Sequence, residues 1–134
     1  YARLLALDGA LYGTTYQGGA SYGWGTVFKV STSGVEKVLY RFQAGKDGAH
    51  PYYAGLVDRN GALYGTTYQG GASGAGTVYK LATSGAGEHV VYSFKGGSDG
   101  QYPYAGPIFV NGSLYGTTNL GGSSGAGTIF KVTP

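Results

Sequence analysis

Apolar residues in this chain alternate with polar residues over short stretches, and glycine-rich turns separate the stretches. In residues 77–81, Tyr79 and Leu81 share one side of an extended chain and Val78 occupies the other, and residues 89–94 alternate in the same way. No window carries apolar residues at helical spacing over three turns, and glycine interrupts every candidate. The pattern predicts β-strands that are apolar on both faces, which is typical of a sheet packed between two other sheets.

Three dipeptides indicate where the chain reverses between short strands. Asp8-Gly9, Asn60-Gly61 and Asn111-Gly112 each lie between two apolar stretches. Asn or Asp followed by Gly suits a type I′ hairpin, because both central residues of that turn need positive φ. Each hairpin is followed by a glycine-rich stretch and by two further predicted strands, except that the last copy has only one. We therefore expect four antiparallel strands in each complete unit.

The sequence repeats itself. LYGTTYQGGAS occurs at residues 11–21 and again at 63–73, and LYGTTNLGGSS follows at 114–124. The marker residues Tyr12, Tyr64 and Tyr115 are 52 and 51 positions apart. These intervals divide the chain into repeat 1 (residues 1–52), repeat 2 (53–103) and a partial repeat 3 (104–134).

Four strands in about 51 residues is the size of one β-propeller blade. A two-sheet sandwich and a β-solenoid are the alternatives, although neither accounts as well for a repeat of this length. Eleven strands do not complete a propeller, which usually has about four to eight blades. We therefore expect a propeller-like ring or stack that is completed by other chains or by further repeats, and we expect that the chain is not a stable monomer.

The sequence motifs of repeat 2 carry a resemblance to a known family. LYGTTYQGGASGAGTVYKL, then TSG, VVYSF and DGQYPYAG, follow one another at residues 63–106. This order resembles the extracellular tandem repeats called GloVer, which occur in proteins with varied surface anchors. The resemblance implies secretion or surface exposure and a propeller-like fold. It supplies no catalytic residues.

Composition narrows the range of functions. The chain has 28 Gly and 14 Tyr, no Cys and no Met, and a net charge of +3 from scattered single charges. The absence of Cys excludes disulfides and thiol chemistry, and scattered charges argue against a nucleic-acid partner. No apolar run approaches the ~18 residues of a membrane span. Without Met, Tyr1 is not expected to be the start of translation, so we expect a removed leader or a piece of a longer product.

The carboxylates do not form a pattern expected of a catalytic site. Asp8 lies in a turn, Asp47 and Asp99 precede Gly in equivalent loops, and Glu36 and Glu88 begin equivalent strands, where we expect them to face solvent. General acid–base catalysis needs positioned pairs, and no repeat has such a pair that the others lack. We expect no enzymatic activity and no cofactor.

The two histidines do not indicate a repeated metal site. His50 lies where repeat 2 has Tyr102, so only a single Asp47/His50 site is conceivable. A histidine in a loop is more often solvated than bound to a metal. The sequence therefore predicts no metal centre.

Aromatic residues on the strands are expected to form the packing between sheets. Tyr12, Tyr64 and Tyr115 mark the second strand of each repeat. A buried tyrosine hydroxyl needs a partner, and Thr14 and Thr66 lie close enough in sequence to be candidates.

Aromatic residues in the loops are candidates for ligand contact. Repeats 1 and 2 place a ring, an amide and a glycine turn together at residues 16–19 and 68–71, and repeat 1 alone adds a tryptophan where repeat 2 has Ala75. Sugars are recognised by this combination of aromatic face and amide groups. Repeat 3 has Asn119-Leu120 instead of the ring and amide. The candidate ligand residues are Tyr16, Gln17, Trp24, Tyr68, Gln69 and Asn119.

Two functions remain open at this point. The first is an extracellular or cell-surface scaffold that acts through self-association, as a homo-oligomer or filament. The second is a carbohydrate-binding module that uses the Tyr-Gln-Gly-Gly loops, with glycans as partners and several weak contacts combined into avidity.

Overall fold

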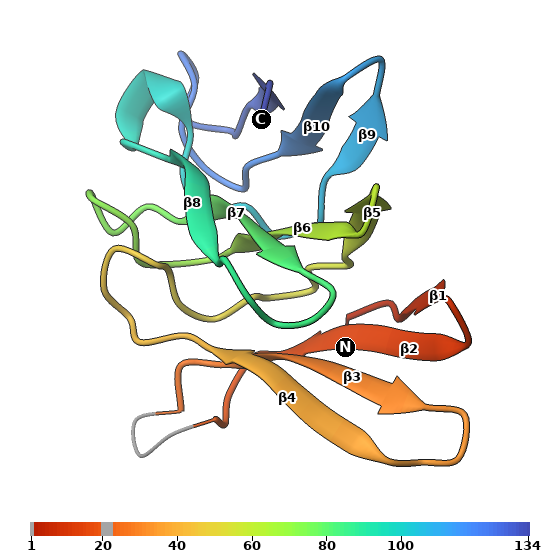
Figure 1. The fold of residues 1–134 in the computed structure, drawn as a ribbon. Coiled ribbons are helices and arrows are strands. Elements are labelled where there is room, and N and C mark those ends of the chain that lie inside the picture. Colours follow the sequence, from red (N-terminus) through yellow and green to blue (C-terminus); the bar gives the residue numbers. More distant parts are fainter. Residues whose placement is uncertain (1, 20–22) are drawn as a thin grey trace.

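The computed structural model describes residues 2–19 and 23–134, and within them the chain forms three antiparallel sheets (Figure 1). The first sheet contains β1 (Leu5–Leu7), β2 (Ala10–Thr15), β3 (Thr26–Ser31) and β4 (Glu36–Arg41). The second contains β5 (Val57–Arg59), β6 (Ala62–Thr67), β7 (Thr77–Ala82) and β8 (His89–Ser93). The third contains β9 (Ile108–Val110), β10 (Ser113–Thr117) and β11 (Ile129–Val132), and a 3-10 turn, η1 (Gly97–Asp99), precedes it.

The strands follow one another in each sheet in chain order, β1-β2-β3-β4, β5-β6-β7-β8 and β9-β10-β11. The eleven strands of the described residues confirm the predicted number. The predicted hairpin turns are also confirmed, because Asp8 and Asn60 have φ of 48° and 54° and the glycines after them are positive as well. The fold is all-β, and none of the three sheets closes on itself.

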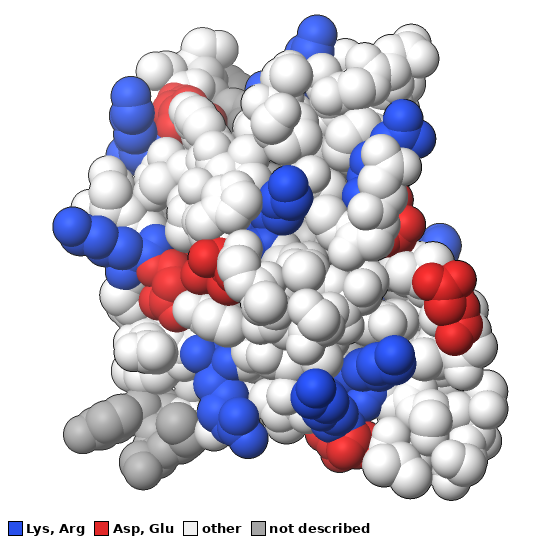
Figure 2. Space-filling view, in the orientation of Figure 1, with Lys and Arg blue, Asp and Glu red and all other residues white. Residues whose placement is uncertain are grey.

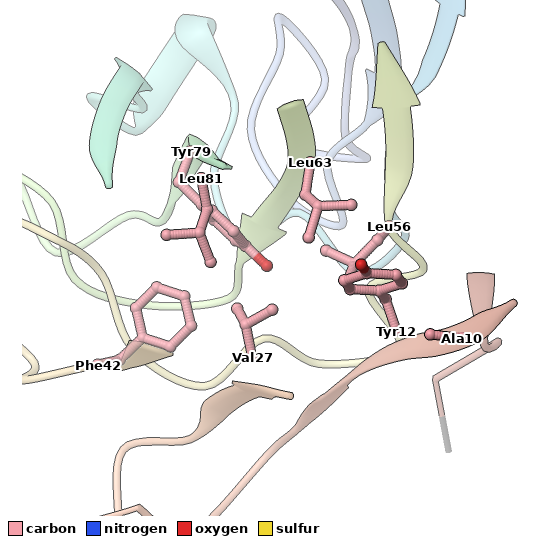
Figure 3. Close-up of a cluster of buried hydrophobic side chains, with 8 residues drawn as sticks. All are labelled: Ala10, Tyr12, Val27, Phe42, Leu56, Leu63, Tyr79 and Leu81. Carbon is pink, nitrogen blue, oxygen red and sulfur yellow. The ribbon is translucent and has the colours of Figure 1, made fainter. Parts of the chain in front are cut away.

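The sheets are stacked, so that the second sheet is covered on both faces (Figure 1). Toward the first sheet it presents Leu63, Tyr79 and Leu81, which pack on Tyr12, Val27 and Phe42 (Figure 3). Toward the third sheet it presents Tyr64, Val78 and Phe94, which pack on Leu114, Phe130 and Val132. The opposite directions of Tyr79 and Val78 confirm the alternation predicted from the sequence.

A glycine in the second strand of each repeat makes room for the ring of the strand beside it. Gly65 pairs with Tyr79, and a Cβ on Gly65 would lie 2.6 Å from the Tyr79 ring. Gly13 is related in the same way to Phe28, and Gly116 to Phe130. The rings lie flat across these glycines, which explains the Gly of the repeated LYGTT.

In each of the first two sheets, one threonine hydroxyl joins the sheet to the linker that follows its repeat. Thr14 Oγ1 donates to the carbonyl of Ala54, and Thr66 Oγ1 donates to that of Ala105, each over 3.1 Å. The hydrogens of these two threonine hydroxyls thus go to backbone carbonyls, which the sequence did not predict. The linkers lie so close together that a Cβ on Gly106 would overlap the carbonyl oxygen of Gly55.

None of the described segments forms a helix of the length and hydropathy needed to cross a bilayer.

Candidate functional site

The loop tyrosines of repeats 1 and 2 lie in a cluster of rings beside the linkers between repeats. The Tyr16 ring stacks on His50 with centroids 4.4 Å apart, and the Tyr68 ring packs on Tyr102 at 4.8 Å with the two planes tilted by 31°. His50 and Tyr102 are equivalent, since both have positive φ and both donate a backbone N–H to the loop of the preceding sheet. We call this set the tyrosine cluster: Tyr16, His50, Tyr52, Tyr53, Tyr68, Tyr102 and Tyr104.

Tyr52 joins the two halves of the tyrosine cluster. Its ring meets Tyr16 and Tyr104 edge-on, each at 5.0 Å. Burial, followed by the nearby Tyr104 hydroxyl, raises the pKa of Tyr68, and a hydrogen bond with Tyr52 is the main cause that raises the pKa of Tyr53. These two hydroxyls therefore stay protonated at neutral pH, and the cluster presents neutral rings with polar edges.

Asn119 keeps the backbone position of the loop tyrosines without their ring. Its N–H donates to the Tyr102 carbonyl over 3.0 Å, as that of Tyr68 donates to the His50 carbonyl over 2.9 Å. The Asn119 side chain is exposed. Repeat 3 thus repeats the loop path but adds no ring to the tyrosine cluster.

Trp24 and Gln69 lie together in a different place, a hollow of about 570 Å³ between the first and second sheets. We call it the Trp24 hollow, and its wall includes Trp24, Ala44, Lys46, Gln69, Gly71 and Gly74. The Tyr68 ring belongs to the tyrosine cluster, so the neighbouring Tyr68 and Gln69 serve different surfaces. The predicted ring-and-amide pair is therefore divided, because adjacent residues of an extended backbone point to opposite sides. Gln17 is exposed.

Asp47 and Asp99 fasten the loops that precede the linkers, as predicted for structural carboxylates. The Tyr40 hydroxyl donates to Asp47 over 3.0 Å, and the Tyr92 hydroxyl donates to Asp99 over 2.6 Å. Backbone N–H groups of Gln43 and Lys95 add a second bond to the respective carboxylates.

The one conceivable metal site is not assembled. Asp47 accepts hydrogen bonds from its own loop, and Nδ1 of His50 lies 2.9 Å from the Tyr16 carbonyl oxygen. Within residues 2–19 and 23–134, no three His, Asp or Glu side chains gather as a metal site would require.

Glu88 does not face solvent, which corrects the prediction made for it. Its side chain is half-buried against the first sheet, and its Oε1 atom has no hydrogen-bond partner among the described residues. Burial is the main cause that raises the pKa of Glu88, and the Asp47 carboxylate adds to it, while the Tyr40 hydroxyl opposes the shift. Glu36, at the start of the equivalent strand, is exposed as predicted.

Replacing Glu88 with Gln is expected to stabilise the protein at pH 7. The folded state raises the pKa of Glu88 and therefore favours its protonated form. The stability that this protonated carboxyl contributes is fully present below the unfolded pKa and is lost as pH rises through the folded pKa. At pH 7 the gain in free energy of unfolding should reach at most about 1 kcal/mol, since the group is partly exposed and screened. Below about pH 4 the gain should vanish.

Thermal unfolding of the Glu88→Gln variant at pH 4 and pH 7 measures this difference. Glu36→Gln is the matched control, because it makes the same change on an exposed side chain and should alter neither value. An equal effect of Glu88→Gln at both pH values would contradict the prediction.

Sequence reasoning missed several members of both surfaces. Tyr52 and Tyr104 were not singled out and His50 was considered only as a metal ligand, although both linkers carry an aromatic ring on each side of a proline, at residues 50–52 and 102–104. That recurring pattern was the available signal. No comparable signal pointed to Lys46, because a single basic residue in a loop is common.

Charges are interspersed on the face shown in Figure 2, where Lys and Arg side chains lie singly or in small groups among uncharged surface and Asp and Glu. That face carries no continuous basic stripe of the kind that binds nucleic acid.

Comparison with known proteins places the chain in a repeat family. A search among curated proteins found no significant match. The family model described as the Gloeobacter/Verrucomicrobia repeat matches residues 1–134, the whole of the sequence given. With its recurring LYGTT strands and Asp/Asn-Gly hairpins, this chain belongs to the Gloeobacter/Verrucomicrobia repeat family.

Proposed function

We propose that the protein is a non-catalytic, extracellular or cell-surface scaffold whose copies associate head to tail through the outer faces of the first and third sheets. Such packing extends the stack of propeller-like blades into a closed ring or an open filament. The extracellular setting is supported by the resemblance to surface-anchored repeats. The non-catalytic role is supported by the structural use of Asp47 and Asp99.

The observation that carries the proposal is the exposure of Ile129. Val27 and Val78, which occupy the same position in repeats 1 and 2, are 0% exposed because a further sheet covers them, whereas Ile129 is 82% exposed. Ile108 and Tyr115 lie beside Ile129 on the same open face. These three residues form the third-sheet outer face.

The first sheet presents the complementary surface at the other end of the stack. Its outer face carries Leu11, Phe28 and Val30, which are only half-buried. The same positions are fully covered in the second sheet, by the packing of the first sheet on Leu63, Tyr79 and Leu81. The two open faces are thus equivalent to the two sides of an interface that already occurs twice within the chain. This continuity supports a second copy as the occupant.

Replacing Ile129 with Glu is expected to abolish association of the 134-residue polypeptide. A buried, unpaired carboxylate costs several kcal/mol, so the affinity should fall at least about a hundredfold. Native mass measurement and sedimentation report the result directly. Val35→Glu is the control, because Val35 is also exposed, at 69%, but lies in the β3–β4 turn.

A folded wild-type species of 13.7 kDa at every concentration tested would contradict the proposal. Association that survives Ile129→Glu would show that copies meet through a different surface.

A second candidate function is carbohydrate binding, and the tyrosine cluster favours it. The rings of Tyr16 and Tyr53 are exposed, at 39% and 45%, and a hollow of about 150 Å³ lies between them and Tyr52. Aromatic rings with polar edges suit sugars, which present both C–H faces and hydroxyls. A glycan array tests this function, with saturable binding expected for wild type and lost when Tyr16→Ala and Tyr68→Ala are combined.

A further inference from the structure

The walls of the Trp24 hollow are held in place by backbone hydrogen bonds. Gly71 donates to the Gly45 carbonyl over 3.0 Å, and Ala49 and Gln69 exchange two bonds of 2.7 and 3.0 Å. These bonds join the loop of repeat 1 to the loop of repeat 2. The hollow is therefore formed before any ligand arrives, which reduces the entropy lost on binding.

Trp24 is fixed as one wall of this hollow. Its ring meets His50 edge-on at 5.2 Å, and its carbonyl accepts the His50 N–H over 2.8 Å. The side chain remains half-exposed and lines the hollow. Several other residues that line the hollow are glycines, and a Cβ on Gly74 would meet no atom within 4 Å. The lining thus combines one flat ring with peptide groups that no side chain covers.

The charged group of the hollow is a cation. Lys46 lines it, and the carboxylate of the neighbouring Asp47 is occupied by the Tyr40 hydroxyl and by backbone N–H groups of its own loop. Asp47 therefore has little hydrogen-bonding capacity left for a ligand, while the Lys46 ammonium carries three donors. An anionic group is the complement of this wall.

We propose that the Trp24 hollow binds an acidic saccharide, with a pyranose ring on Trp24, ring hydroxyls on the Gln69 amide and the sugar carboxylate on Lys46. The proposal rests on the second candidate function, carbohydrate binding, and assigns it a site and a substrate class. Tryptophan is the aromatic side chain with the largest flat apolar surface, and an amide both donates and accepts hydrogen bonds to hydroxyls. The site is single, because the next repeat has Ala75 in place of Trp24 and the third has Leu120 in place of Gln69.

The repeats themselves provide variants that should fold. Ala75 accepts the Tyr102 N–H over 2.8 Å, just as Trp24 accepts that of His50. Leu120 exchanges backbone bonds with Gln101 as Gln69 does with Ala49. Trp24→Ala and Gln69→Leu therefore introduce residues that this fold already accommodates at equivalent positions.

The decisive experiment is a fluorescence titration, because the chain contains a single Trp and that Trp lines this hollow. The full chain is titrated with an oligogalacturonate and with a neutral galactose oligomer of the same length. A saturable change with the acidic oligomer only is expected, weakened about tenfold by Lys46→Ala or by Gln69→Leu and diminished by salt. Lys37→Ala, on the exposed part of β4, should leave it unchanged. Trp24→Ala has no tryptophan emission to follow, so its binding is measured by calorimetry and should be absent.

Three results would overturn the proposal. Equal binding of the neutral oligomer would reject the acidic class while leaving carbohydrate binding intact. Glycan-array binding that depends on Tyr16 and Tyr68, without any change in Trp24 emission, would reject this site alone. The absence of binding in both the array and the titration would reject the site and the second candidate function together.

Discussion

Replacing Gly106 with alanine is expected to destabilise the protein by about 3 kcal/mol or more, because added atoms in a closely packed interior force the backbone to move. The new Cβ would overlap the carbonyl oxygen of Gly55, and a backbone atom cannot turn aside as a side chain can. This contact lies where the linkers before the second and third sheets meet. The loss should appear as a lower midpoint in urea unfolding, with the amplitude of the transition retained.

Gly55→Ala is the matched control for Gly106→Ala. A Cβ on Gly55 would meet only Arg3, at 3.8 Å, which is an ordinary contact. This variant should unfold within about 0.5 kcal/mol of wild type, or slightly above it through the reduced entropy of its unfolded chain. Similar midpoints for the two variants would show that the linkers do not meet as described.

Replacing Tyr79 with Phe is expected to stabilise the protein by about 1–3 kcal/mol, the cost of a buried polar group without a partner. Tyr79 is 0% exposed, and its hydroxyl has no hydrogen-bond partner among the described residues. Burial, and next the Glu88 carboxylate, raises the pKa of Tyr79, so the hydroxyl stays neutral. The ring itself should keep its contact with Phe42, whose centroid is 5.1 Å away. Thermal and urea unfolding measure the gain.

The reverse substitution, Phe130→Tyr, tests the same argument in the interface between the second and third sheets. Phe28 and Phe130 occupy the positions equivalent to Tyr79, so the fold accepts phenylalanine there. Phe130→Tyr places a hydroxyl beside Gly116 and should lower stability. A loss of stability in Tyr79→Phe would mean that this hydroxyl is hydrogen-bonded after all.

Local pattern was sufficient to predict the strands and hairpins. The Asp8-Gly9 and Asn60-Gly61 turns follow from two residues whose backbones accept positive φ at low cost. The direction of Tyr79 and Val78 follows from the two-residue period of a strand, which needs no knowledge of the partner sheets.

The candidate site was predicted only in part. The sequence grouped Tyr16 and Tyr68 as a repeated pair, and both rings lie in the tyrosine cluster, but their separation from Gln69 depends on which sheet each side chain meets. The burial of Glu88 is of the same kind, since Tyr40 and Asp47, which belong to repeat 1, lie beside it. Glu36 has the same local sequence setting and remains exposed.

Sequence alone thus determined the number of strands in the described residues, the Asp-Gly and Asn-Gly hairpin turns and the opposite directions of Tyr79 and Val78. These properties arise from backbone conformational preference and from the period of an extended chain, which act over a few residues. Only the tertiary structure decided that His50 stacks on Tyr16 across 34 positions and that Trp24 and Gln69 share one hollow. Contacts of that range depend on how one sheet is placed against the next, and the placement follows from the packing of whole faces, which no local pattern contains.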